Sequence, residues 1–416
     1  MKMAFSLGKS RTLCFLYILI YVWCCSAPYA SAQTPGDEMV LLAPGDSAVL
    51  AVNDSVQQKK SKSLWKKLVN YFKNSDKREA CKNFDFGFLP GPHYSSTVGL
   101  GLGLVATATY SSDFADKSLP RSNAALYGDL TTGGFFLIGI KGLHIFPRER
   151  YKLDYKLNLS TFLTDYYGMG YALNNEDYNK ASFRRNRVEA IARFLFRLAP
   201  KTYLGPTFSY RFIQAAEVKQ RDLPLFENQR KNLHATSPGV TFLYDSRDFI
   251  QNASKGVYFQ VDQSFTPHFL GNDYCFSSTE VTLSGYKKVW RGGVLAAEYH
   301  SLFNYGHTPW GFMAEVGNNN RMRGYYEGRY RDQNLIEAQV ELRQNIKKRH
   351  GMVVWVGAAQ IFEQLKDMRF RYTLPNGGIG YRWEFKKGIN VRLDYGLSKN
   401  GGGFIFSLNE AFRAIK

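Results

Sequence analysis

The chain has 416 residues, a formal net charge of +19 and a mean hydropathy of −0.32. Beyond residue 32 no apolar run approaches the roughly 18 residues of a membrane-spanning helix, so the sequence predicts no transmembrane helix there. The 37 glycines and 15% aromatic residues are typical of a chain built from strands and turns. The five cysteines do not form the pattern of a disulfide framework.

Residues 1–32 are predicted to form a secretory signal peptide. Basic residues precede the apolar run LCFLYILIYVWCC, and Ala30 and Ala32 supply the small side chains that a cleavage site needs. The alternative is a membrane anchor, but the run is shorter than the roughly 20 residues that cross a bilayer. In an exported chain with this charge, we expect the anionic neighbour to be lipid phosphate rather than nucleic acid.

Residues 33–96 are expected to be a periplasmic segment with one basic amphipathic helix, at about residues 61–78. The apolar stripe of this helix consists of Leu64, Trp65, Leu68, Val69 and Phe72. Such a helix would lie on an anionic membrane surface, or it would plug or pack beneath the domain that follows. The alternative is a partly disordered segment that becomes helical only on contact.

From residue 97 to residue 412, apolar and polar residues alternate with the period of a β-strand. The segments YKLDYKLNLS, IEAQVELRQ and GINVRLDYGL show this alternation without exception. Sixteen candidate strands fall in this range, the eleventh at 311–316 and the twelfth at 335–345. A soluble sandwich alternates in the same way, but its exposed faces rarely carry so many aromatic residues. The pattern therefore favours an all-β fold, a transmembrane antiparallel β-barrel of about 16 strands with a wet, polar lumen.

The segment MRGYYEGRYRDQN lies between the eleventh and twelfth candidate strands. It resembles the Arg-Gly-Phe/Tyr signature of the BamA/TamA family of outer-membrane assembly proteins, the bacterial surface antigen family. The resemblance implies a sixteen-stranded barrel in which this loop folds back into the lumen. The loop motif would then consist of Arg323, Gly324 and Tyr325.

Two further segments are similar to the same family. One is YDSRD, whose strand-end motif comprises Tyr244, Asp245, Arg247 and Asp248. The other is the C-terminal stretch from GIGYRWEF to LNEAF, which looks like the closing hairpins of the barrel. The resemblance covers most of residues 97–412, and residues 413–416 form a short tail beyond it.

A guanidinium group that leaves bulk water needs carboxylate partners, and its planar fork suits bidentate pairing. Glu337 and Glu341, on the polar face of the following strand, are therefore the expected partners of Arg323. Gly324 would allow a tight turn, and Tyr325 would pack against the inner wall. The alternative is a solvated basic loop. Arg329 is expected to be more exposed than Arg323.

The sequence departs from the family pattern in three places. Gly357 and Ala359 stand where the family usually has an aspartate partner for the loop arginine. The tail RAIK continues past the terminal aromatic residue, Phe412. Residues 33–96 lack the pattern of a POTRA domain, which indicates a short form of the family without these receiving domains.

The resemblance implies an outer-membrane barrel with a lateral seam between its first and last strands, acting in insertion or transport of outer-membrane protein or lipid in a Gram-negative bacterium. The alternative is a gated or passive outer-membrane pore. An enzyme is not expected, because the seven histidines lack metal-ligand spacing and no nucleophile elbow occurs. No cofactor or metal is predicted. The expected partners are outer-membrane lipids including lipopolysaccharide, substrate outer-membrane proteins and separate periplasmic proteins, and the oligomeric state is left open.

Overall fold

The computed structural model describes residues 84–95, 99–113, 119–219, 222, 226, 229–386 and 389–412. The predicted signal peptide, the predicted helix with Leu64, Trp65, Leu68, Val69 and Phe72, and the tail 413–416 lie outside these residues. None of the helices in the described ranges is long and apolar enough to cross a membrane.

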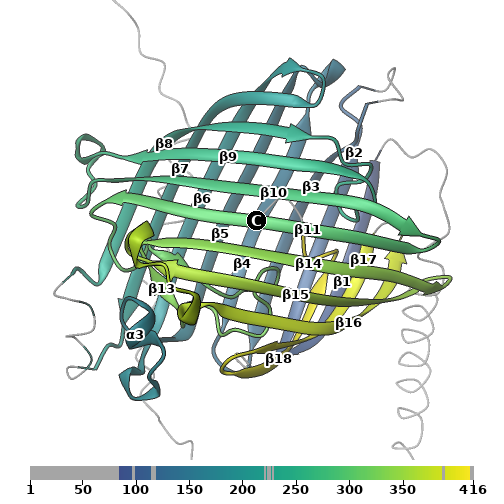
Figure 1. Ribbon diagram of the computed structural model, residues 1–416. Coiled ribbons are helices and arrows are strands. Elements are labelled where there is room, and N and C mark those ends of the chain that lie inside the picture. The colour runs from purple at the N-terminus through teal and green to yellow at the C-terminus, as the bar shows by residue number, and fades with distance from the viewer. Residues whose placement is uncertain are drawn as a thin grey trace, which may run out of the picture. The chain divides into compact units, whose positions relative to one another are not determined.

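Sixteen strands form one sheet in which each strand pairs with the next in antiparallel orientation (Figure 1). These strands are β1 (Phe84–Ser95), β2 (Gly99–Tyr110), β3 (Ser122–Thr131), β4 (Phe136–Ile145), β5 (Tyr151–Tyr166), β6 (Ala181–Ala199), β7 (Thr202–Ala216), β8 (Asn232–Asp245), β9 (Gly256–Thr266), β10 (Phe276–Trp290), β11 (Gly293–Gly306), β14 (Asn334–Lys347), β15 (His350–Phe362), β16 (Leu374–Lys386), β17 (Ile389–Ser398) and β18 (Gly401–Leu408). A separate two-stranded sheet consists of β12 (Ala314–Glu315) and β13 (Arg331–Asp332).

Helical structure is confined to the connections between strands. The one α-helix is the single turn α3 (Tyr171–Asn174), and the 3-10 turns are η1 (Pro147–Glu149), η2 (Asp177–Asn179), η4 (His268–Leu270), η5 (Leu365–Asp367) and η6 (Phe370–Tyr372), all within the described part of the chain. The described residues therefore form an all-β fold.

The sheet closes into a barrel because its two end strands, β1 and β18, contact each other (Figure 1). A Cβ atom added to Gly91 of β1 would lie 3.4 Å from the ring of Phe406 of β18. In the described ranges, the hydrogen-bonded ladders run from β1 through to β18, and none joins β18 to β1. We call this contact the seam.

The strands place apolar side chains outside and polar side chains inside, as the alternation predicts. On β14, the inward-facing side chains of Glu337, Gln339 and Glu341 are buried, whereas the outward-facing Val340 is 44% exposed. Large apolar side chains are exposed on most other strands of the wall, Leu157 of β5 among them. An apolar outer face around a polar interior is the arrangement that a lipid bilayer requires of a barrel.

The predicted number of sixteen strands is confirmed, but one predicted member of the set was wrong. Residues 311–316 do not form a wall strand; only Ala314 and Glu315 are in strand conformation, and they pair within a loop. Consecutive residues of this stretch, from Trp310 to Ala314, are buried, so it has no exposed face. Its place in the set is taken by β1.

The sheet begins at Phe84, not at residue 97 as expected, so β1 comes from the segment assigned to the periplasm. The prolines at 90 and 92 argue against a central strand, because proline has no backbone N–H to donate to a ladder. A strand at the end of a sheet tolerates them, and β1 has that position. The last strand ends at Leu408, and residues 409–412 leave the wall.

Candidate functional site

Residues 307–333, which connect β11 to β14, occupy the interior of the barrel, and we call them the lumen loop. The first half of the loop packs Trp310 and Phe312 against side chains of β5, β6, β7, β8 and β10. Residues from Ala314 onward contribute to another cluster with β14, β15 and β16, namely Ala314, Val316, Met322, Tyr325 and Tyr330. The loop therefore forms, together with side chains of the wall, the two largest buried apolar clusters of the described residues.

The Arg323 side chain at the tip of the lumen loop is fully buried between two carboxylates. Its Nη1 donates to Asp394 Oδ2 on β17 at 2.7 Å, and its Nη2 donates to Glu341 Oε2 on β14 at 2.6 Å. The guanidinium carbon lies 3.6 Å from the ring centre of Trp355 on β15, a cation–π stacking distance. Three wall strands therefore hold this one side chain.

Gly324 brings the loop backbone into contact with the wall. Its φ of 106° is unfavourable for residues with a side chain. A Cβ atom here would lie 2.7 Å from the backbone carbon of Gly396 on β17. The close approach therefore requires glycine on both the loop and the strand.

Tyr325 packs against the inner wall, where its hydroxyl donates to the Pro375 carbonyl oxygen at 2.7 Å and accepts from the Lys399 backbone N–H at 3.3 Å. Burial raises the pKa of this tyrosine to about 12.

The structure separates the two acids that the sequence offered as partners of Arg323. Glu341 contacts the guanidinium, but Glu337 is bonded to the ring nitrogen Nδ1 of His300 at 2.7 Å and lies 3.9 Å from Nε of Arg321. The expectation that Glu337 pairs with Arg323 was wrong, because residues four apart on a strand are about 13 Å apart, more than one guanidinium spans. Glu337 still contacts the lumen loop, through Arg321.

The second acid is Asp394, which sequence reasoning missed as a partner. Gly357 therefore does not leave the arginine with a single carboxylate, because β17 supplies the other one. The available signal was the position of Asp394 on the polar face of GINVRLDYGL. Its neighbour Arg382 also donates to Asp394 Oδ1 at 2.5 Å, so the acid is shared by two arginines.

Two other arginines of the lumen loop are also paired. Arg329 is 8% exposed and so is more exposed than Arg323, as expected, although it is still buried; it donates from Nη2 to Asp177 Oδ1 at 2.7 Å. Arg331 is fully buried beside Glu315, which also bonds Arg185 of β6 at 3.1 Å. Arg329 thus binds the loop to the connection between β5 and β6, whereas Arg331 pairs within the loop, and Glu315 links this pair to β6 through Arg185.

Asp332 in β13 gives the lumen loop a pH dependence. Burial raises the pKa of its carboxyl to about 6, above the ordinary value of about 3.9. The folded loop therefore holds the proton more tightly than the unfolded chain, and this stabilisation is complete below the ordinary pKa and lost as the pH rises through about 6. Asp332→Asn is expected to raise the thermal midpoint at about pH 8 and to change it little at about pH 4. Equal shifts at both pH values would contradict this assignment.

The strand-end motif lies at the other end of the barrel, between β8 and β9. Arg247 donates from Nε and Nη2 to the two oxygens of Asp245, at 2.8 and 2.7 Å. Asp248 accepts the backbone N–H groups of Ser254 and Lys255, which closes the turn. The described contacts of this motif are local and do not connect it to Arg323.

Tyr244, the first residue of the motif, is part of β8 and pairs with Phe259 of β9 and Thr202 of β7. It is therefore a residue of the wall.

Residues 409–412 turn into the lumen after β18 ends. Glu410 accepts from Arg382 Nε at 2.9 Å and from Asn390 Nδ2 at 2.7 Å. The Tyr286 hydroxyl donates to the Phe412 carbonyl oxygen at 2.7 Å, and the Phe412 ring is buried. The C-terminal segment thus joins the last strands to β10 on the far side of this end of the barrel.

Comparisons with known proteins agree with this architecture. The profile of the Omp85 superfamily domain matches residues 143–408, more than half of the chain. Among solved structures, BamA from Haemophilus ducreyi lacking POTRA domains 1-3 superposes with a TM-score of 0.51 at 14% identity, covering 79% of this chain and 70% of that chain.

CdiB from Acinetobacter baumannii gives a TM-score of 0.51 at 11% identity, covering 80% of this chain and 61% of that chain. CdiB from Escherichia coli gives the same score at 12% identity, with 79% and 60% covered. At these identities the structural likeness shows the fold alone. No curated protein matches the sequence.

Omp85 proteins are non-enzymatic insertion or transport factors of the Gram-negative outer membrane, in agreement with the expected location and with the expectation of no enzyme activity. On the profile match, and with a barrel that encloses its own loop, the chain belongs to the Omp85 superfamily of outer-membrane assembly and translocation barrels.

Proposed function

We propose that this protein inserts or transports outer-membrane proteins or lipids by parting β1 from β18 at the seam. The observation that carries the proposal is that, in the described residues, every pair of neighbouring wall strands is joined by a hydrogen-bonded ladder except β1 and β18, which are only in contact. Each ladder hydrogen bond adds roughly 0.5–1.5 kcal/mol of net stability, so a boundary without a ladder is the least costly place to open the wall.

The contents of the lumen favour this function over a passive pore. The lumen loop fills the interior with two apolar clusters and is anchored by buried ion pairs of Arg323. A pore needs a continuous aqueous path, and a packed apolar core obstructs one. A gated pore would have to move the loop first, at the cost of separating Arg323 from two carboxylates.

The proposed partners follow from location and charge. Outer-membrane lipids, lipopolysaccharide among them, would contact the basic surface of the protein, which has a sequence pI of about 9.5. Substrate outer-membrane proteins would approach the seam, where an unladdered edge can pair with an incoming strand. Separate periplasmic proteins would present such substrates to the barrel.

A crosslink across the seam tests the proposal. Cysteines at Gly91 and Phe406, joined by a short thiol-reactive linker, would hold β1 to β18. Cys81 and Cys275 are first replaced by serine, since Cys275 is a free exposed thiol. The control crosslinks Ala106 to Leu126, which are direct partners in the β2–β3 ladder.

The measurement is the rate at which an unfolded outer-membrane barrel folds into liposomes that contain the crosslinked protein. We expect the seam crosslink to remove the acceleration and the ladder crosslink to preserve it. The proposal fails if the seam crosslink forms and folding of the test barrel is still accelerated to the uncrosslinked level.

A further inference from the structure

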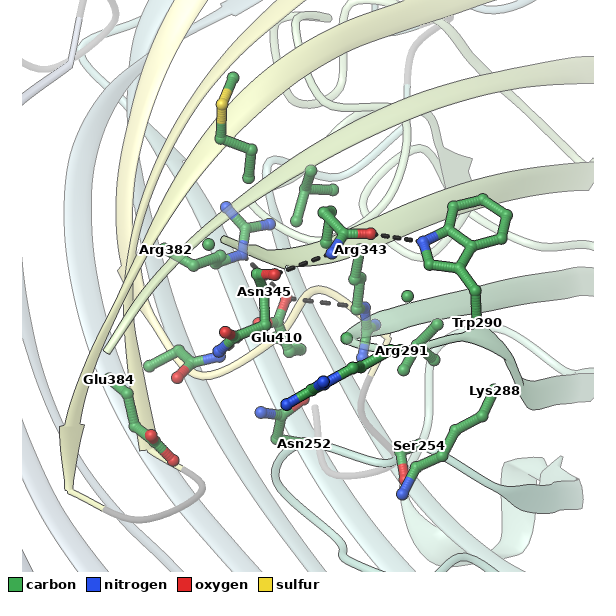
Figure 2. A pocket seen from close by; sticks show the side chains of 18 of the residues that line it. Asn252, Ser254, Lys288, Trp290, Arg291, Arg343, Asn345, Arg382, Glu384 and Glu410 are labelled. Carbon is green, nitrogen blue, oxygen red and sulfur yellow. Dashed lines mark hydrogen bonds and ion pairs between the residues drawn. The ribbon is translucent and has the colours of Figure 1, made fainter. Parts of the chain in front are cut away.

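A cavity of about 390 Å³ lies at one end of the barrel. This is the end away from the β11–β14 connection, where the lumen loop enters the interior. Its lining comes from the β10–β11 and β14–β15 hairpin ends, the turn before β9, strands β16 and β17, and the C-terminal segment. Figure 2 shows the bonded side chains of Arg343, Arg382 and Glu410 at the cavity, with Lys288 and Arg291 nearby.

The lining of this cavity is strongly cationic. Five basic side chains line it, namely Lys288, Arg291, Arg343, Arg349 and Arg382. Two carboxylates line it as well, and one of them, Glu410, is already occupied by Arg382 and Asn390. Within the described ranges, the side chains of Lys288 and Arg291 have no hydrogen bond or ion pair. Positive charge therefore exceeds the negative charge available to it.

Two buried guanidinium groups at the cavity have unused donors. Arg343 uses Nε for Glu341 and Nη1 for the Ala253 carbonyl oxygen, and its Nη2 is buried without a partner. Arg382 uses Nε for Glu410 and Nη1 for Asp394, and its Nη2 is also buried without a partner. A buried charged donor without an acceptor is unfavourable, so both guanidinium groups add positive charge beside the cavity that their hydrogen bonds do not fully compensate.

We propose that this cavity binds a phosphate group. Arginine forks match the oxygen geometry of phosphate, and a lysine adds a point charge without directional demands. A phosphate on its own is much smaller than the cavity, so the space also admits the headgroup of an anionic phospholipid. Free phosphate and a phospholipid headgroup present the same chemistry, and the two sources are distinguished by experiment.

The test uses the purified full-length protein in nanodiscs of phosphatidylcholine, with inorganic phosphate as the first probe at ionic strength held constant with chloride. The test variant is Lys288→Gln combined with Arg291→Gln, both exposed side chains whose replacement leaves the core intact. The matched control is Lys287→Gln, the adjacent exposed lysine, which does not line the cavity. Affinity is measured by calorimetry and by the rise in thermal midpoint.

We expect the parent and Lys287→Gln to bind phosphate with the same affinity. The double variant should bind it at least about tenfold more weakly, because the loss of one charge-assisted hydrogen bond lowers affinity by about that factor. The second arm replaces phosphate with phosphatidylglycerol in the nanodisc. Stabilisation by this lipid alone assigns the site to a headgroup, and stabilisation by inorganic phosphate assigns it to the free anion. Equal responses of all three proteins to both probes, or equal binding of acetate, would overturn the proposal.

Discussion

Arg323→Ala is expected to release the lumen loop and to destabilise the barrel by about 3 kcal/mol, because a buried pair is broken from one side. The value falls at the lower end of the range for broken buried pairs, since Glu341 keeps Arg343 and Asp394 keeps Arg382. The measurements are the temperature at which the compact form is lost on a gel and the protease sensitivity of the loop.

Two companion variants make the arginine test specific. Arg323→Lys is expected to be intermediate, because an ammonium group cannot bridge carboxylates on β14 and β17 and also stack on Trp355. Arg329→Ala is expected to cost only about 0–1 kcal/mol, since its partner Asp177 is 87% exposed. Three variants with the stability of the parent would show that the ion pairs do not hold the loop.

Gly396→Ala is expected to push the lumen loop away from β17. The added Cβ would lie 2.4 Å from the Arg323 carbonyl oxygen and 2.8 Å from the Gly324 nitrogen, and backbone atoms cannot move aside as a side chain would. Overpacking of this kind costs about 1–3 kcal/mol or more. The loop should become protease-sensitive, as in Arg323→Ala.

The matched control for this change is Gly285→Ala on β10, where an added Cβ meets nothing within 4 Å. Combining Gly396→Ala with Arg323→Ala should cost less than the sum of the two single changes, because both act by displacing the same loop. Additive effects, or equal effects of Gly396→Ala and Gly285→Ala, would contradict the close loop-to-wall contact.

The wall of the barrel could be predicted from sequence because each spanning strand must show lipid one face and the lumen the other. The constraint produces an alternation of apolar and polar residues along a strand, and β14 and β17 show this alternation closely. It fails for β1, where two prolines and two glycines obscure the pattern, and for residues 311–316, all of which except Glu315 are buried. Neither segment carries an amphipathic signal strong enough to decide its place.

The partners of Arg323 could be predicted only in part. Glu341 is on the strand that directly follows the loop, so chain proximity points to it. Asp394 and Trp355 are separated from the loop by one or more hairpins, and the sequence does not say which parts of a closed wall face a loop tip. Only the three-dimensional closure of the barrel brings β17 to Gly324.

The inward turn of the C-terminal segment has a physical cause that the sequence shows in retrospect. Glu410 is six residues after Phe404, so on a continued strand the two side chains would lie on the same face. Phe404 is 50% exposed on the outer face of the barrel. A longer β18 would place this carboxylate in lipid, at a high desolvation cost. Asn409, with a φ of 62°, turns the chain instead, and Glu410 reaches Arg382 in the lumen.

The central claim is that this barrel assembles or transports outer-membrane components and does not serve as a solute pore. Depleting the protein from its own host and quantifying outer-membrane proteins and lipids tests the claim most directly. We expect a defined set of outer-membrane proteins or lipids to be lost, and the parent but not its seam-crosslinked form to restore them. An unchanged outer-membrane composition, with loss only of small-solute uptake, would contradict it.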